Sequence, residues 1–142
     1  MTGSNARRIV FGALNPSTGA RLLMTARRNG GPEFRGYLRL LRGTFRWWDL
    51  LLMLDRGLCH TATAALALAA ALRITLAWLP TACPELNPTE ALWRDGEQHV
   101  SANRAHPDLD AHAGAFAAHA GCAPRHTRAC DGLSWRSRAC RA

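Results

Sequence analysis

The sequence predicts a mixed α/β fold in one domain of ordinary size. Short apolar segments rich in β-branched and aromatic residues alternate with segments of helical spacing. The 142 residues are 48% hydrophobic and 20% charged, a composition typical of a globular chain that can bury a core. An antiparallel hairpin at the start, followed by alternating helices and strands, indicates a sheet with parallel neighbours later in the chain.

Local patterns predict the elements in chain order. β-branched and aromatic residues favour a strand over residues 8–14, and the turn formers of 15–19 connect it to a second strand over 20–25. Helical spacing or high alanine content predicts the helices, and short apolar runs predict the strands. The later elements are a helix over 33–41, a strand over 48–54 buried on both faces, a helix over 61–72, a strand over 74–79 and a helix over 88–105.

These patterns become weaker near residue 105. We expect a partial domain over residues 8–105 and a C-terminal tail over 106–142 that is partly helical, over 111–120, or disordered. Cysteines and histidines in the tail raise the question of zinc. Their spacings differ from those of common zinc motifs, and Pro124 interrupts any shared helical face. We therefore do not expect a zinc site at Cys122, His126 and Cys130, with His119 and Cys140 nearby.

The charge is strongly basic and unevenly distributed. All 18 basic residues are arginine, against 10 acids, and the net charge is +8. Such charge attracts DNA phosphates, although an ordinary solvated surface enriched in arginine is the alternative. No apolar stretch reaches the roughly 20 residues of a membrane span, and no signal-peptide pattern is found, so we expect a cytoplasmic protein without a membrane partner. The candidate DNA-binding residues are Arg27, Arg28, Arg35, Arg39 and Arg42.

Two acids stand at positions that a parallel sheet would bring together. Asp55 follows the apolar run 50–54, and Glu90 opens the last long helix after one helix, one strand and one turn. Side chains at the carboxyl ends of neighbouring parallel strands meet at one sheet edge. Two adjacent carboxylates are stabilised when they share divalent cations, and Mg²⁺ prefers such oxygen ligands. Two such ions would bind the attacking and leaving oxygens of a phosphodiester displacement.

Each of these residues also has a simpler interpretation. Asn87, Pro88 and Glu90 suit the N-cap, N1 and N3 positions of a helix, so Glu90 alone could be a capping residue. An Asp after a strand, taken alone, is more often a loop residue. The joint arrangement is what favours a metal site. The tryptophans beside the predicted elements are expected in the core rather than stacked on bases: Trp47, Trp48, Trp78 and Trp93.

Three segments resemble bacterial insertion-sequence transposases of the DDE superfamily, in its mariner-like branch. They are Phe-Gly-Ala-Leu-Asn-Pro-Ser-Thr-Gly at 11–19, Leu-Asp-Arg-Gly-Leu-Cys-His at 54–60, and the Leu-Pro-Thr to Leu-Trp segment at 79–93, which is the most specific. The resemblance covers about residues 8–105. It implies a ribonuclease-H-like mixed sheet with flanking helices, and three acids with two Mg²⁺ (or Mn²⁺) ions that cut and join double-stranded DNA at transposon ends and target.

By residue matching, this resemblance assigns roles to single positions. Asp55 would be the second metal-binding acid and Glu90 the third. His60 matches the family's histidine at that offset, without a derived role, and Asn87 adjoins Glu90 in the motif. Arg56 stands where the family has Asn, and a cation beside Asp55 would compete with the metal.

The family's first acid lies on a strand before the hairpin, and here the residues before the hairpin contain no acid. We therefore expect an N-terminally truncated domain that lacks its first strand and is catalytically inactive alone. The alternative is a non-catalytic basic remnant that binds DNA or a full-length transposase. A sheet without its first strand exposes an apolar edge, so we also expect poor solubility or self-association into a homo-oligomer.

Overall fold

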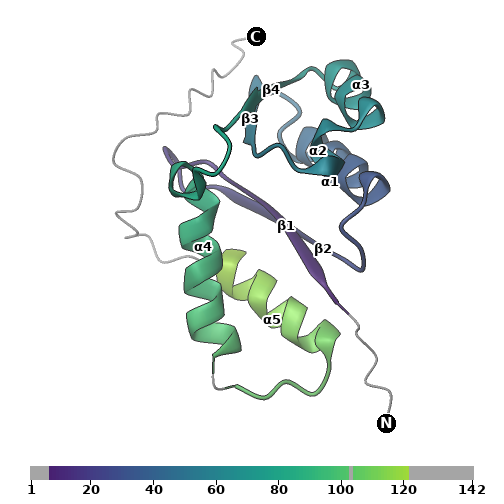
Figure 1. Cartoon of the computed structure of the whole chain (residues 1–142). Coiled ribbons are helices and arrows are strands. Elements are labelled where there is room, and N and C mark those ends of the chain that lie inside the picture. Colours follow the sequence, from purple (N-terminus) through teal and green to yellow (C-terminus); the bar gives the residue numbers. More distant parts are fainter. Residues whose placement is uncertain (1–6, 103, 122–142) are drawn as a thin grey trace.

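The computed structural model describes residues 7–102 and 104–121, which form two small sheets flanked by helices (Figure 1). In the first sheet β1 (Ile9–Leu14) pairs antiparallel with β2 (Arg21–Ala26). In the second, β3 (Leu50–Leu54) pairs parallel with β4 (Ile74–Trp78). The predicted mixed α/β fold is confirmed. The helices are α1 (Gly31–Thr44), α2 (Leu58–Thr61), α3 (Thr63–Ala71), α4 (Pro88–Gly96), the π-helical turn η2 (Glu97–Ser101) and α5 (Leu109–Gly121), with a 3₁₀ turn η1 (Pro84–Leu86) before α4.

Hydrogen bonds of Asn15 and the backbone conformation of Gly19 form the turn between β1 and β2. The Asn15 N–H donates to the Ala20 carbonyl at 2.8 Å, and the Asn15 side-chain oxygen accepts the Ser17 N–H at 2.9 Å. Gly19 has a φ of 72°, in the left-handed region that glycine adopts without strain. This turn fixes the register in which Ile9 lies opposite Ala26.

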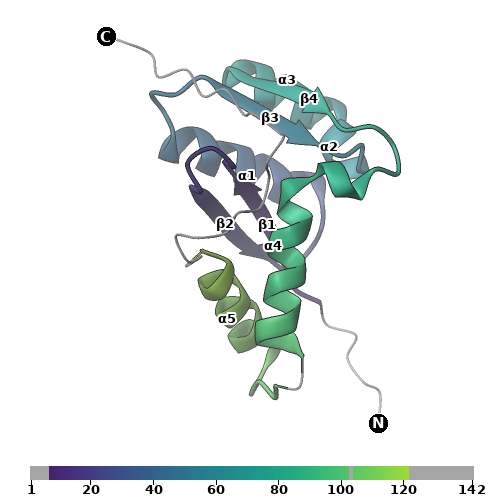
Figure 2. The ribbon, with the colours of Figure 1, turned by 90° about the vertical axis from the view of Figure 1, so that its left-hand side faces the viewer.

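One face of α1 joins the two sheets into a single core. Phe34, Tyr37, Leu38 and Leu41 recur at helical spacing along α1 and are all buried. They cluster with Phe11 of β1, with alanines of α3 and with Ile74 of β4. Figure 2 shows α1 between the hairpin and the β3–β4 pair. The position of β3 relative to the hairpin therefore depends on α1.

The opposite face of the hairpin carries α4 and α5. Successive residues of a strand point to opposite faces, so Gly12 faces away from the side that Phe11 presents to α1. A Cβ added at Gly12 would lie 2.5 Å from the Trp93 ring of α4, so only glycine permits this close approach. Figure 2 shows α4 and α5 side by side against the hairpin. α4, which carries Glu90, is thus held against β1.

Several expectations for the middle of the chain are wrong. α1 continues to Thr44, so the next strand begins at Leu50 and the intervening residues form a surface turn. Trp47 is therefore 72% exposed and Trp48 38% exposed, rather than in the core. β3 is not buried on both faces, because α1 and α3 cover one face and Leu51 on the other is 42% exposed.

The predicted helix over 61–72 begins earlier and is interrupted. Ala62 has extended backbone angles, φ −58° and ψ 133°, which separate α2 from α3. The last predicted long helix ends in the π-helical turn η2 rather than at residue 105. None of the helices in residues 7–102 and 104–121 has the length and apolar character to cross a membrane. Cys122, His126, Cys130 and Cys140 lie outside the described residues.

Because the Tyr37 hydroxyl is buried, we expect the free energy of unfolding to fall at alkaline pH. Its O–H donates to the Leu22 carbonyl at 2.9 Å, and burial raises the pKa of Tyr37 above the ordinary value of 10.0. The unfolded chain therefore loses this proton above pH 10 while the folded chain keeps it, so the stability present below pH 10 is lost as the pH rises. We expect a loss of about 1.4 kcal/mol per pH unit there.

Urea unfolding from pH 9 to 11.5 would measure this loss. The chain has one tyrosine, so Tyr37→Phe should remove the tyrosine contribution to the slope. Burial also raises the pKa of Cys59, which adds a slope of the same sign in both proteins. The difference between the two proteins therefore isolates Tyr37, and parallel slopes would contradict the prediction.

Candidate metal-binding site

A cavity of about 590 Å³ lies between the two sheets. All residues of β1 and of β3 line it. Among the described strands, β1 pairs only with β2 and β3 only with β4, so each has one edge without a partner strand. Strands of this length extend for about 17–20 Å. The cavity is therefore a slot bounded on both sides by strands, and we call it the β1–β3 slot.

Four of the residues singled out from the sequence line this slot. Asp55 follows the carboxyl end of β3, and His60 comes from α2. Asn87 and Glu90 come from the beginning of α4. The fold thus brings Asp55 and Glu90 to the lining of one cavity. Arg56 does not line the slot, and it makes no ion pair with Asp55 in the described part of the chain.

His60 fixes one oxygen of the Asp55 carboxylate. The His60 Nδ1 lies 2.6 Å from Asp55 Oδ1, and the Gly57 N–H donates to the same oxygen at 3.2 Å. The imidazole packs on the Phe34 ring of the core, with ring centroids 4.6 Å apart. Within residues 7–102 and 104–121, no group binds the other carboxylate oxygen. Asp55 is therefore held in place through Oδ1, with Oδ2 available to a cation.

Among the described residues, the Glu90 carboxylate at the beginning of α4 has no hydrogen-bond or ion-pair partner. Asn87 caps the helix, because its side-chain oxygen accepts the Thr89 N–H at 3.1 Å and the Thr89 hydroxyl at 2.7 Å. Glu90 is half-buried in the first turn, where the helix dipole stabilises an anion. In the described part of the chain its carboxylate forms no hydrogen bond, so the reciprocal capping contact is not made.

The oxygen donors of this site suit one hard divalent cation. They are too few to bind two such cations. Asp55 and Glu90 supply carboxylates of the type that Mg²⁺ prefers. Asp49 also lines the slot, but it precedes β3, so about 20 Å of extended chain separates it from Asp55. Asn29 lines the slot as well, near Cys59, whose thiol lies 3.5 Å from its side-chain oxygen. No sequence motif indicated Asn29.

The five candidate DNA-binding arginines differ in their surroundings. Arg27, Arg28 and Arg39 are exposed, whereas Arg35 is half-buried. Arg42 is half-buried and donates to four backbone carbonyls. Its Nε binds the Leu72 oxygen at 2.7 Å and Nη2 the Arg73 oxygen at 2.7 Å, and Nη1 binds the Trp48 and Phe45 oxygens at 2.9 and 3.3 Å. Arg42 therefore serves the fold, and the exposed arginines are the stronger candidates for phosphate contact.

Comparisons with known proteins identify related sequences and folds. The family described as DDE superfamily endonuclease matches residues 1–112. The crystal structure of the catalytic core domain of BIV integrase is similar, with a TM-score of 0.56 and 21% identity over 78% of this chain and 74% of that chain.

A second solved structure shares the fold. The simian T-cell lymphotropic virus intasome, in complex with PP2A regulatory subunit B56 gamma, gives a TM-score of 0.60 and 12% identity. That match covers 94% of this chain and 55% of the viral chain, so this chain spans about half of its length. No curated protein sequence matches. The two structural likenesses confirm the predicted ribonuclease-H-like fold.

Proposed function

Because this chain belongs to the DDE superfamily endonucleases, we propose that it is part of the catalytic domain of a bacterial insertion-sequence transposase. Its substrate would be double-stranded DNA, at transposon ends and target, and its compartment the cytoplasm. The reaction would be cutting and joining of phosphodiesters. The observation that carries the proposal is that Asp55, which follows β3, and Glu90, from the first turn of α4, line one cavity although they come from distant segments.

In this proposal Asp55 and Glu90 hold Mg²⁺ (or Mn²⁺), which when bound would activate the attacking oxygen and stabilise the leaving one. His60 orients Asp55 by holding Oδ1, and the core contact of its ring with Phe34 limits rotation. The amino end of α4 stabilises the negative charge of Glu90. Asp55 and Glu90 are thus the metal ligands in this proposal, and His60 positions one of them. The other ligands that two metal ions need would come from outside this set of residues.

We further propose that the chain is inactive by itself, because Asp55 and Glu90 supply only two of the three acids that the family uses. The test is a plasmid-nicking assay with Mg²⁺ and Mn²⁺. The chain alone should not nick DNA, whereas a fusion that adds a six-residue apolar strand ending in Asp before residue 8 should gain nicking. Nicking by the unfused chain that Asp55→Ala abolishes would refute the inactivity. Nicking by the fusion that survives Glu90→Gln would refute the assigned site.

The exposed arginines favour a second candidate function, a basic remnant that binds DNA or a full-length transposase without cutting. Arg27 and Arg28 adjoin in the exposed segment between β2 and α1. Their double replacement by alanine should weaken binding to any duplex sequence and reduce the slope of log K against log salt by about 2, since each phosphate contact contributes about 0.9. Fluorescence anisotropy across salt concentrations measures this slope. The exposed Arg104, far along the chain, provides the control Arg104→Ala, and equal slopes in all three proteins would contradict the contact.

The β1–β3 slot also leads us to expect a homo-oligomer. Among the described strands, β1 and β3 each have one edge without a partner strand, and such edges beside apolar residues favour pairing with another chain. Sedimentation velocity should therefore show concentration-dependent association, and Leu51→Lys on the exposed face of β3 should reduce it. A single monomeric species at all concentrations, with a sharp cooperative melt, would contradict this expectation.

A further inference from the structure

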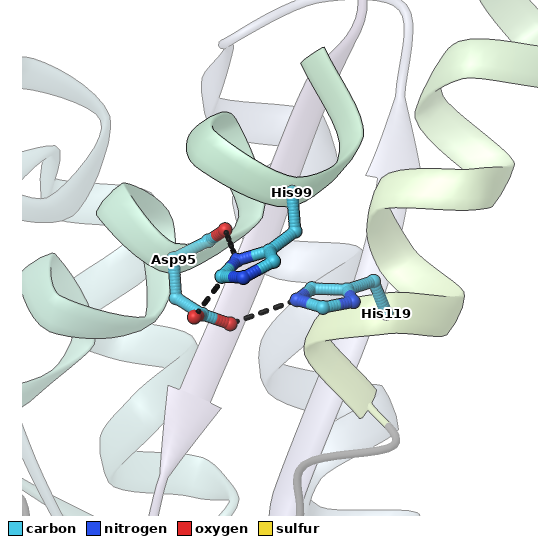
Figure 3. A group of neighbouring side chains, drawn as sticks. All are labelled: Asp95, His99 and His119. Carbon is cyan, nitrogen blue, oxygen red and sulfur yellow. Dashed lines mark hydrogen bonds and ion pairs between the residues drawn. The ribbon is translucent and has the colours of Figure 1, made fainter. Parts of the chain in front are cut away.

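Asp95, His99 and His119 form a second cluster away from the slot, at the contact of α4, η2 and α5 (Figure 3). One ligand atom from each residue lies within 4.8 Å of the others. His119 Nε2 is 2.8 Å from one Asp95 oxygen, and His99 Nδ1 is 3.1 Å from the other. Figure 3 shows the three side chains pointing toward one another, Asp95 from α4, His99 from η2 and His119 from α5. None of the three lines the β1–β3 slot.

The fold positions these side chains before any ligand binds. Asp95 and His99 are four residues apart across the change from α4 to the π-helical turn η2, and such π turns occur frequently at functional sites. Gly96 permits close packing of α5, because a Cβ there would lie 2.5 Å from the Phe116 ring. The Arg21 guanidinium donates to the Ala120 carbonyl at 2.7 Å and holds the end of α5. His119 is thereby brought to Asp95.

We propose that Asp95, His99 and His119 bind a zinc ion that links α5 to α4. Two imidazoles and one carboxylate form a typical three-residue zinc ligand set, with water as the fourth ligand. Mg²⁺, which prefers an octahedron of oxygens, fits this set poorly. The zinc site therefore differs in ligand chemistry from the one assigned to Asp55 and Glu90, and it does not depend on the proposed function.

The distances permit such a site with small side-chain movements. Tetrahedral zinc with ligands at 2.0–2.1 Å requires ligand atoms about 3.3 Å apart. His119 Nε2 lies 2.8 Å from Asp95 Oδ2 and His99 Nδ1 lies 3.1 Å from Oδ1, and the ligand atoms of all three residues lie within 4.8 Å of one another. Binding of an ion would draw the two nitrogens toward one oxygen and would replace the 3.0 Å contact of His99 Nδ1 with the Asp95 backbone carbonyl. The two histidine rings stack with centroids 5.3 Å apart. The side chains of His99, Asp95 and His119 are 56%, 49% and 34% exposed, so the two imidazole rings and the carboxylate have room to rotate and admit an ion and a water.

The chain offers a matched control in a second histidine pair. His106 and His112 stack in the same way, with centroids 4.6 Å apart. They bind the Val100 carbonyl and the Ser101 hydroxyl instead of a carboxylate. This pair therefore reproduces the ring stacking without the third ligand.

The experiment measures the thermal melting temperature of the full chain against free zinc concentration, with magnesium as a parallel titration. At free zinc 100 times its Kd, the folding equilibrium constant should rise about 100-fold, seen as a clear increase in melting temperature. Asp95→Asn, His99→Gln and His119→Gln, each made singly, should lose this increase. His106→Gln should retain it, and magnesium should produce none.

Thiolates are good zinc ligands in general, so the type of ligand needs its own measurement. Cobalt bound by Asp95, His99 and His119 should give a tetrahedral visible spectrum without the near-ultraviolet band of thiolate ligation. Circular dichroism checks that each variant folds without metal. One folded variant among the three is enough to test whether the cluster binds zinc. The proposal is overturned if zinc leaves the melting temperature of the native chain unchanged. It is equally overturned if the folded variants respond to zinc as the native chain does, or if thiolates supply the cobalt ligands.

Discussion

Replacement of Asp55 by asparagine is expected to weaken divalent-cation binding in the β1–β3 slot by about 10³-fold. The substitution keeps the shape of the side chain and its contact with His60 but removes the negative charge. One unit charge at about 4 Å contributes roughly 4 kcal/mol near a protein surface, which corresponds to about a 10³-fold loss of affinity. In the fusion that carries a third carboxylate, DNA nicking should fall by a similar factor.

Iron-mediated backbone cleavage would measure the cation site directly. Fe²⁺ substituted for Mg²⁺ and treated with ascorbate and peroxide cuts the chain near the bound ion, so we expect cuts near residues 55 and 90 and their loss in Asp55→Asn. The matched control is Asp49→Asn, because Asp49 lines the same slot at the other end of β3. Cuts that persist in Asp55→Asn, or that disappear in Asp49→Asn, would contradict the assignment.

Replacement of Arg42 by alanine is expected to lower the free energy of unfolding by about 3 kcal/mol, although Arg42 itself lines neither the β1–β3 slot nor the Asp95 cluster. The guanidinium joins the end of α1 to the turn after α3, where Arg73 has a φ of 54°. Its removal leaves the carbonyls of Leu72, Arg73 and Trp48 without this donor. Lysine should not restore the stability, because one ammonium group cannot span the carbonyls that the planar guanidinium reaches.

Urea denaturation of the purified variants measures this loss. Arg39→Ala, one turn earlier on α1 and exposed, is the control and should change the unfolding free energy by less than about 0.5 kcal/mol. A midpoint for Arg42→Ala equal to that of the control would show that the four carbonyl contacts do not stabilise the fold.

The sequence predicts most elements of this fold, and the exceptions have specific physical causes. Periodicity locates α1 and the hairpin, since buried residues repeat at helical spacing and the Asn15 to Gly19 turn has strong local chemistry. The start of β3 is misplaced by two residues, because Trp48 extends its apolar run although this side chain is 38% exposed. The break at Ala62 has no local signal, since alanine is the best helix former.

The two candidate sites differ in how far the sequence predicts them. Strand and helix order suffices to bring Asp55 and Glu90 to one cavity. The contact of His60 with Asp55 depends on the short α2, which places the ring between the carboxylate and Phe34. The spacing of Asp95 and His99 is visible in the sequence, but His119 joins them only because α5 packs over Gly96.

The absence of any backbone hydrogen bond between β1 and β3, among the described strands, has a mechanical consequence. The hairpin and the parallel pair are connected through packed side chains on α1, which resist shear less than a continuous ladder does. We therefore expect the hairpin to move relative to the β3–β4 pair more easily than neighbouring strands of one ladder do, on the microsecond to millisecond scale of collective motions. The distance between Asp55 and the hairpin can therefore vary. A strand that paired with both β1 and β3 would limit this variation.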